Sequence, residues 1–458
     1  MTQLFLIPVI AFSRTLVFLL RATGKGSGTA LPGLLVSRYF PFAFAALVSQ
    51  IPRIVVITGT NGKTTTQTML SAILDQQEDI TVLRNQAGAN LLQGILSQLL
   101  REANWLGQLH FSHAILEVEE ATLPQIAQVL RPEIITVTNL YRDQLDAYGE
   151  TDMTERLIRD GITQCPQALV VVNGDDPRTS RLTRGLDNAT YFTSLPQAYS
   201  ADIPYEGETQ DTQSRTDNIL RAVDIQIKPN LTSDVTVVGS LAGAAIAPLP
   251  INIASPGFFH VYNALAAITM AKLLGVGDRA ITQGFNNFKP AFGRGEILGR
   301  EQGNKRVNFQ LLLVKNPASL SLSLDLLTRV KRLKIIFAIN DNIADSKDVS
   351  WLWDSQLERL NQADIDWILC TGIRAKDMKV RLKYALDGSH KTIEASQGKP
   401  GVPADLVQQI LAQEDIRQAI AMGSDRAQDQ DTIYVLPTYT AMLEFRKIMG
   451  KSLDSSDL

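Results

Sequence analysis

The chain has 458 residues, of which 45% are hydrophobic and 20% charged, so it can build two or three sizeable domains and is too apolar to be disordered. Its 44 lysines and arginines nearly balance 47 aspartates and glutamates, and a net charge of −3 gives no support for broad nucleic-acid binding. Two distant cysteines, Cys165 and Cys370, exclude a disulfide framework and a cysteine-rich zinc site, and a reducing cytosol is the simplest setting.

The N-terminal 50 residues are rich in apolar side chains. Two apolar runs, residues 4–12 and 16–20, flank Arg14, and neither reaches the roughly 18 residues that a membrane span needs. We expect no signal peptide, because no small-residue cleavage site follows. We predict a buried helical segment of the first domain. The alternative is a helix against a membrane surface, with Arg14 and Arg21 at lipid headgroups, and residues 42–48 allow the same two interpretations.

The pattern after residue 50 alternates strands and helices. Residues 54–58 are mostly β-branched and are typical of a buried parallel strand. A glycine turn follows, and apolar residues then recur at helical spacing from 69 to 74. Further strands are expected at 113–118, 134–138 and 168–172, with a helix at 121–130. This alternation predicts a doubly wound parallel sheet.

A second α/β unit is expected in the C-terminal part. The polar, acidic residues 199–217 indicate a surface loop. Ordered structure is expected again at 235–238 and in a helix at 261–274. The glycine- and charge-rich stretch 293–303 is the candidate domain boundary. Beyond it we predict strands at 307–313, 335–339, 367–370 and 432–436, helices at 375–386 and 404–411 and after the last strand through 449, and a frayed tail at 451–458.

The strongest chemical signal is Thr58-Gly59-Thr60-Asn61-Gly62-Lys63-Thr64. Backbone N–H groups of a glycine loop that feeds a helix N-terminus form a cradle for phosphate. Lys63 can then reach the terminal phosphates, and the Thr64 hydroxyl can bind Mg²⁺. The strict P-loop pattern requires glycine where this chain has Ile57. The alternative is an ordinary strand-to-helix turn that happens to carry lysine.

Polar side chains follow the other predicted strands. Glu117 ends the strand at 113–118, where a carboxylate is well placed to hold Mg²⁺, although a solvated strand-end acid is the alternative. Glu119 competes for that role, because alternation puts it on the same side. Asn139 follows the next strand and faces the same edge. Residues 173–177, Asn-Gly-Asp-Asp-Pro, indicate a turn first and a functional loop second.

Six blocks, spread in the family's order over about half of the chain, resemble the Mur ligase superfamily. They are residues 58–64, Glu117, Thr138-Asn139-Leu140, residues 173–177, Tyr262-Asn263-Ala264-Leu265-Ala266-Ala267 and Gly293-Arg294. Members activate a carboxylate with ATP as an acyl phosphate, which an amine then attacks. The resemblance implies a P-loop ATPase domain with a doubly wound parallel sheet at 1–297, including the apolar helical segment 1–50, and a Rossmann-like α/β domain at 298–458.

More specific stretches resemble the MurT family of lipid II isoglutaminyl synthase subunits. They are residues 85–90, 142–150, 315–317, 340–342, 348–351 and 437–443. The 57 residues before Thr58 are too few for the nucleotide-sugar-binding domain of the main peptidoglycan ligases, which folylpolyglutamate synthases also lack.

This resemblance implies a two-subunit amidotransferase of peptidoglycan synthesis. A GatD-type glutaminase subunit would release ammonia from glutamine. The present chain would phosphorylate the α-carboxylate of D-glutamate in the lipid II stem peptide, and ammonia would displace phosphate to leave D-isoglutamine. The expected setting is the cytoplasm or the inner face of the cell membrane, with at most a peripheral membrane association.

The resemblance also implies roles for individual residues. Lys63 would contact the ATP phosphates, Thr64 and Glu117 would hold Mg²⁺, Asn263 would contact adenine and Arg294 the phosphates. The full set expected around ATP is Thr58, Gly59, Thr60, Asn61, Gly62, Lys63, Thr64, Thr65, Asn139, Asn263 and Arg294. Asp348 would complete the partner's Cys-His pair as the third triad member. From the residues alone, Asp348 is better explained as a helix N-cap, and Asp345 competes for the triad role.

Three departures from the family pattern stand out. Several MurT proteins carry a four-cysteine zinc ribbon, but only Cys165 lies in that region, so we predict no structural zinc. His260 stands where the family usually has asparagine, so a subsidiary nucleotide contact differs. Many Mur ligases use a carbamoylated lysine for a second Mg²⁺. Lys228, the sole lysine between Lys63 and Lys272, has an unmatched context and leaves that site open.

Two other functions compete with this one. A stand-alone amino-acid ligase of the folylpolyglutamate type would need no glutaminase. A non-catalytic nucleotide-binding scaffold would bind ATP without substrate-stimulated turnover. The combination of Lys63, Thr64, Glu117 and Arg294 argues against a scaffold, which has no use for all four.

Overall fold

The structure is a computed structural model, which describes residues 5–22, 30–85, 89–141, 151–197, 217–228, 231–255, 257–290, 293–386 and 409–450. Four features of the sequence fall mainly outside these ranges. They are the stretch 142–150, all but the last residue of the expected loop 199–217, most of the expected helix 404–411 and the tail 451–458.

Among the described residues, nine strands form the first sheet, in the order β2-β3-β1-β4-β5-β6-β7-β8-β9. The strands are β1 (Arg53–Thr58), β2 (Val82–Arg84), β3 (His113–Glu117), β4 (Ile134–Val137), β5 (Leu169–Asn173), β6 (Thr190–Ser194), β7 (Ile219–Ile227), β8 (Ser233–Leu241) and β9 (Ala244–Ile253). Pairing is parallel as far as β7, and β7, β8 and β9 pair antiparallel. The predicted parallel sheet is therefore present, and it carries an antiparallel edge.

Helices cover both faces of this sheet. They are α1 (Leu6–Ala22), α2 (Leu31–Tyr39), α3 (Phe42–Val48), α4 (Lys63–Leu74), α5 (Leu92–Glu102), α6 (Leu123–Leu130), α8 (Thr151–Thr163), α9 (Pro177–Leu182), α11 (Phe258–Leu273) and α12 (Asp278–Asn287). Successive residues of β1 point to opposite faces. Val55 and Ile57 pack in a core with α4, α11 and α12, whereas Ile54 and Val56 pack with α1, α2, α3, α5 and α6. The helical segment predicted in the first 50 residues thus covers one sheet face.

A second sheet follows, and among the described residues it has the order β10-β11-β15-β12-β13-β14. Its strands are β10 (Arg294–Gln302), β11 (Lys305–Leu312), β12 (Leu333–Ala338), β13 (Ile365–Thr371), β14 (Leu411–Gln413) and β15 (Thr432–Pro437). Its helices are α13 (Pro317–Leu327), α14 (Trp351–Asp354), α15 (Ala375–Leu386), α17 (Ile416–Arg426) and α18 (Tyr439–Ile448), with 3-10 turns η2 (Ile343–Asp345) and η3 (Leu357–Gln362). The glycine-rich stretch 293–303 mainly forms β10, an antiparallel edge strand of this sheet.

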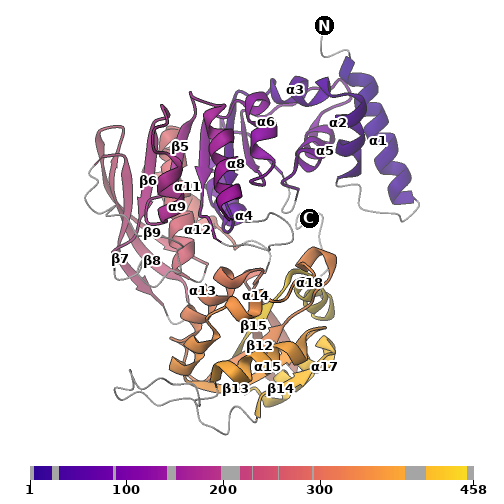
Figure 1. Cartoon of the computed structure of the whole chain (residues 1–458), viewed down its shortest axis with the longest axis vertical. Helices are drawn as coiled ribbons and strands as arrows, with labels where there is room; N and C mark the ends of the chain where they lie inside the picture. Colours follow the sequence, from indigo (N-terminus) through magenta and orange to yellow (C-terminus); the bar gives the residue numbers. More distant parts are fainter. Residues whose placement is uncertain are drawn as a thin grey trace.

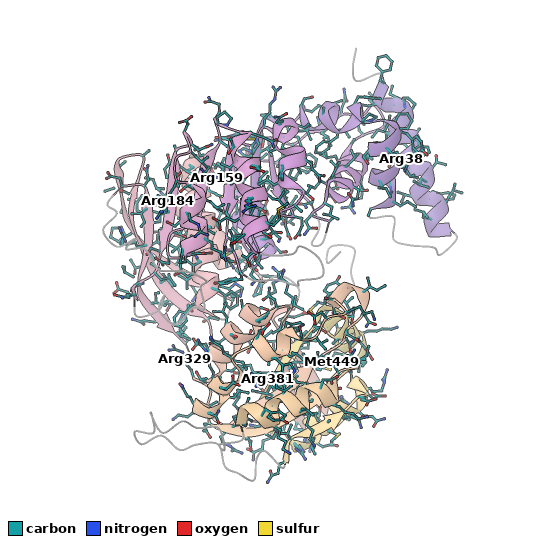
Figure 2. All side chains as sticks on the ribbon, viewed as in Figure 1. Arg38, Arg159, Arg184, Arg329, Arg381 and Met449 are labelled. Atoms are coloured by element: carbon teal, nitrogen blue, oxygen red, sulfur yellow. The ribbon has the colours of Figure 1, made fainter. Side chains whose placement is uncertain are left out.

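Figure 1 shows the first sheet above and the second sheet below, with α1, α2 and α3 at one end of the upper part. The two parts touch at the Arg329 side chain, whose guanidinium lies 5.0 Å from the centre of the Phe258 ring. Figure 2 labels Arg329 at the edge of the lower part that faces the upper one.

Within the described residues, no single helix is both long and apolar enough to cross a membrane. Helices α2 and α3 pass that test only when taken together, and they are bent by 111° relative to each other.

Candidate active site

The loop of residues 59–62, here named the phosphate loop, joins β1 to α4. Gly59 and Gly62 have φ angles of 115° and 92°, in the left-handed region that favours glycine. A Cβ atom on Gly62 would lie 2.3 Å from Asn263 Oδ1, and one on Gly59 would lie 2.5 Å from Thr138 Oγ1. Both glycines are therefore required by backbone shape and by close neighbours. The loop leads into the N-terminus of α4, where free N–H groups favour an anion.

Lys63 is buried at the first position of α4 and lies among three carboxylates. Its Nζ donates to the Gly59 carbonyl at 2.7 Å and pairs with Glu120 Oε1 at 3.0 Å and Glu119 Oε2 at 3.7 Å. Although burial opposes the charged form, Glu120, Glu119 and Glu117 together raise the pKa of Lys63. The side chain is therefore a fixed positive charge beside the phosphate loop.

Glu120 received no role from the sequence, yet it is the nearest acid to Lys63. Glu119 instead accepts a hydrogen bond from Asn90 Nδ2 at 2.5 Å. Burial raises the pKa of Glu119, whereas Lys63, despite burial, lowers the pKa of Glu120, so Glu120 carries the negative charge that faces Lys63. Strand alternation could not reveal this, because β3 ends at Glu117 and a turn begins at Glu120.

Thr64 and Glu117 come together beside Lys63. The Thr64 hydroxyl donates to Glu117 Oε2 at 2.7 Å, and both side chains are buried. Asn85 fixes Glu117 from behind, because its amide bonds both the N–H and the carbonyl of Glu117 at 2.8 Å. A hydroxyl and a carboxylate at a phosphate cradle are the oxygen ligands that Mg²⁺ takes when phosphates and water complete its shell. The donor set therefore fits Mg²⁺, and it is Glu117 rather than Glu119 that reaches Thr64.

Asn139 holds the phosphate loop in shape. Its Oδ1 accepts the Asn61 N–H and its Nδ2 donates to the Asn61 carbonyl, both at 2.9 Å. The Asn139 carbonyl accepts the Thr60 N–H at 3.0 Å, and the Thr138 hydroxyl donates to the Asn61 carbonyl at 2.7 Å. These contacts show that Asn139 and Thr138 hold the phosphate loop in its shape.

Two residues of the second sheet's part reach the phosphate loop or the first turn of α4. Arg294, at the start of β10, donates from Nη1 to Thr65 Oγ1 at 3.2 Å. Asn316, which caps α13, exchanges amide hydrogen bonds with Asn61 at 3.2 and 3.4 Å. In the sequence, residues 315–317 resembled the MurT family, but no role could be given to them. In the structure, Asn316 of this stretch contacts the phosphate loop.

Asn263 lies on α11 against the phosphate loop at Gly62, and its Nδ2 is 3.3 Å from His260 Nδ1. An adenine contact for Asn263 stays a prediction. His260 is buried, with its ring centre 4.1 Å from that of Phe259. Burial and the charge of Arg294 lower the pKa of His260 to about 3, so the ring is neutral at physiological pH.

This burial predicts a pH effect on stability. The folded pKa of His260 lies below the unfolded value near 6.5, so the unfolded chain binds the extra proton between pH 6.5 and 3. Stability should fall with acidification through that window, by at most about 1.4 kcal/mol per pH unit from this group. His260→Asn should lose less stability between pH 7.5 and 5.0. Urea unfolding followed by circular dichroism tests this, and parallel pH profiles for the two proteins would contradict it.

Residues 173–177 form a structural turn. Asp175 accepts hydrogen bonds from the Tyr262 hydroxyl at 2.6 Å and the Leu195 N–H at 2.7 Å. Asp176 caps α9 through its bonds from the N–H groups of Arg178 and Thr179. It also accepts the Leu140 N–H at 2.8 Å, which ties the segment after Asn139 to α9.

Replacing Asp176 with alanine should lower the free energy of unfolding by about 2–4 kcal/mol, because a helix cap is lost and a buried N–H loses its acceptor. Urea unfolding measures the loss. The control is Asp79→Ala, at an exposed position, which should change stability by less than about 0.5 kcal/mol. Equal stability of the two variants would remove Asp176 from the support of the site.

Asp345 and Asp348 have different surroundings. Asp345 is buried, accepts the Thr440 N–H at 2.8 Å and also accepts the Thr440 hydroxyl. Asp348 is half-buried and accepts the Ser350 N–H at 2.8 Å. Helix α14 begins at Trp351 with Ser350 as its N-cap, so Asp348 closes a turn before the helix and is not the cap that the residues alone suggested. The Asp348 side chain is therefore more exposed than that of Asp345.

Lys228 follows β7 and pairs with Asp234 on β8 at 2.9 Å, with both side chains substantially exposed. In the parts of the chain that the structure covers, no three His, Cys, Asp or Glu side chains gather as a metal site. The absence of structural zinc stays a prediction.

The similarity to known proteins covers both sheets. Residues 57–271 match the Mur ligase middle domain family, and residues 313–442 match the MurT ligase C-terminal family. The chain is 29% identical to the lipid II isoglutaminyl synthase (glutamine-hydrolyzing) subunit MurT of Streptococcus pneumoniae, covering 94% of each chain. It is 28% identical to the Staphylococcus aureus subunit MurT, covering 95% of each.

Solved structures share the fold at lower identity. MurF from Acinetobacter baumannii superposes with a TM-score of 0.64 at 17% identity, covering 93% of this chain and 80% of that one. MurF from Thermotoga maritima in complex with ADP gives 0.62 at 14% identity, with coverage of 92% and 84%. The predicted Mur-ligase-type α/β fold is confirmed. The resemblance to MurT subunits that the sequence predicted is confirmed over nearly the whole chain, and the chain is an ATP-dependent ligase of the Mur type.

Proposed function

We propose that this chain is the synthase subunit of a two-subunit amidotransferase. It converts the α-carboxylate of D-glutamate in the lipid II stem peptide to the amide of D-isoglutamine, with ammonia from a GatD-type glutaminase. The observation that supports this proposal most is the share of the chain that resembles MurT subunits. The similarity to MurT subunits extends over 94% of this chain, whereas a UDP-N-acetylmuramate–L-alanine ligase from Caulobacter vibrioides matches 53% of it.

The chemistry suits the residues at the phosphate loop. The substrate carboxylate attacks the γ-phosphorus of ATP, ADP leaves, and ammonia then displaces phosphate from the acyl phosphate. Two anions must approach each other in the first step, and the fixed charge of Lys63 reduces their repulsion. Mg²⁺ held by Thr64 and Glu117 would supply the remaining neutralisation.

Other residues are assigned by position. Residues 58–65 form the phosphate cradle, Asn139 and Asn316 hold its shape, and Arg294 approaches it from the second sheet's part. Asn263, which lies against Gly62, would contact adenine. We also propose the division into an ATP-binding domain and a C-terminal domain that the sequence predicts near residue 297, with all of β10, from Arg294, in the C-terminal domain. The C-terminal domain would bear the glutaminase contact through Asp348. ATP and lipid II precursors meet on the cytoplasmic side of the membrane, where we place the reaction.

The site can be tested without the partner. With detergent-solubilised lipid II, Mg²⁺ and ammonium chloride, the chain should release ADP, and added hydroxylamine should trap the activated carboxyl as a hydroxamate. Lipid II should stimulate ADP release at least about tenfold over the chain alone. ADP release that does not respond to lipid II would contradict the proposed function and favour a nucleotide-binding scaffold.

A further inference from the structure

Helix α1 carries apolar side chains on its exposed side as well as on its buried side. Its inner face places Leu6, Val9 and Ile10 in the core beneath the sheet, fully buried. Its outer stripe consists of Pro8, Phe12, Thr15 and Leu19, is continued by Phe5 just before the helix, and is exposed throughout, with Thr15 as its one polar residue. Phe5 and Leu19 on this stripe are 64% and 53% exposed, and neighbouring Phe18 is 71% exposed. A helix of a water-facing protein ordinarily carries polar side chains there.

The apolar side chains Phe5, Phe12, Phe18, Leu19, Phe40 and Phe42 are here named the N-terminal apolar face, and part of this face is linked by ring contacts. The rings of Phe12 and Phe40 lie 6.1 Å apart, and those of Phe40 and Phe42 lie 6.4 Å apart, so α1 and α3 share an aromatic row. Exposed Trp105 adjoins α1, because the Arg14 guanidinium lies 4.3 Å from its ring centre. Extended exposed apolar patches of this kind mark interaction surfaces.

The charges near this face indicate what kind of surface it binds. Residues 1–52 contain Arg14, Arg21, Lys25 and Arg38 and no aspartate or glutamate, although the whole chain carries a net charge of −3. On α2, Arg38 shares an exposed stripe with Leu31 and Leu34, at spacings of three and four residues. Figure 2 labels Arg38 on this group of helices. Aromatic and aliphatic side chains with only positive charges among them complement an anionic lipid surface.

We propose that the N-terminal apolar face docks this chain onto the anionic surface of a lipid bilayer, with Phe5, Phe18 and Leu19 entering the headgroup region. The proposal goes beyond the proposed function and rests on it in one respect, since a lipid-linked substrate is held in a membrane. Docking would confine the enzyme to the plane in which that substrate diffuses, and would raise the encounter rate without any contact at the phosphate loop.

The test is flotation of the full chain with vesicles, without substrate. Wild type should float with vesicles of equal parts phosphatidylglycerol and phosphatidylcholine, and at least about fivefold less with phosphatidylcholine alone. The triple variant Phe5→Ser, Phe18→Ser, Leu19→Ser should bind at least about tenfold more weakly, and Arg38→Glu about fivefold more weakly. The matched control carries Met153→Ser and Val380→Ser, at exposed apolar positions on α8 and α15, and should float as wild type does.

Three outcomes would overturn the proposal. Wild type could fail to float, the triple variant could float as well as wild type, or the face could pair with a second copy, seen as a dimer that the triple variant loses while vesicles bind neither protein. Amidation of lipid II in detergent micelles is measured in parallel and should be unchanged in these variants. If the variants lose flotation but every protein still amidates lipid II in micelles, the change lies in the docking face. If wild type does not amidate lipid II in micelles, the proposed function is wrong.

Discussion

Replacing Lys63 with alanine is expected to lower lipid II-dependent ADP release by at least about a thousandfold. Lys63 is a buried cation placed where the phosphate loop meets α4, and the carboxylates around it keep it charged. Its removal leaves the repulsion between the substrate carboxylate and the ATP phosphates without its nearest protein countercharge. The rate is measured as ADP release at saturating ATP and lipid II.

The loss must be separated from misfolding, because Lys63→Ala also leaves Glu119 and Glu120 buried without their cation. Lys63→Met keeps the aliphatic stem, so it should melt cooperatively and show the same loss of turnover. Lys331→Ala, at an exposed lysine, should keep full activity. Turnover near the wild-type rate in a folded Lys63→Met protein would show that the phosphate loop is not the reaction site.

Asp348→Asn is expected to abolish amidation with glutamine while leaving amidation with ammonium chloride unchanged. If Asp348 orients the partner's catalytic histidine, the change to an amide should lower glutamine hydrolysis by about ten-thousandfold, the size seen when a triad aspartate becomes asparagine. Ammonia supplied directly bypasses the partner, so the ligase reaction keeps its rate. Both rates are measured on the co-purified complex with lipid II in detergent.

Asp345→Asn is the matched control for this prediction. Asp345 accepts two hydrogen bonds from Thr440, at the start of α18, so its substitution should lower stability and leave the glutamine-to-ammonia ratio unaltered. If Asp345→Asn rather than Asp348→Asn separated the two activities, the triad role would pass to Asp345. If neither variant did, the partner would complete its own triad.

Local patterns in the sequence predicted the phosphate loop well. The β-branched run at 54–58, the glycines at 59 and 62 and the helical spacing after Lys63 each depend on neighbours within a few residues, and β1 and α4 follow them closely. Thr64 and Glu117 belong to adjacent elements whose carboxyl-edge geometry is general to parallel sheets, so their meeting could also be expected.

Contacts between segments that are distant along the chain could not be predicted from the sequence. The hydrogen bonds between Asn61 and Asn316 join positions 255 residues apart, and no periodicity encodes them. Glu120 was missed because strand alternation was extended past the end of β3. The residues of β10 were predicted as a domain boundary and not as a strand, because an antiparallel edge strand is largely exposed and tolerates the glycine and charge that a buried strand would not.

The most direct test of the proposed function combines both subunits. The chain is co-expressed with a GatD-type glutaminase, and the complex is supplied with lipid II, ATP, Mg²⁺ and glutamine labelled with ¹⁵N in its amide. Mass spectrometry of the stem peptide should show a carboxyl OH replaced by ¹⁵NH₂, only when both proteins are present. ATP turnover with a free amino acid and no partner, without amidation of the stem peptide, would contradict the account and assign the chain to the amino-acid ligases.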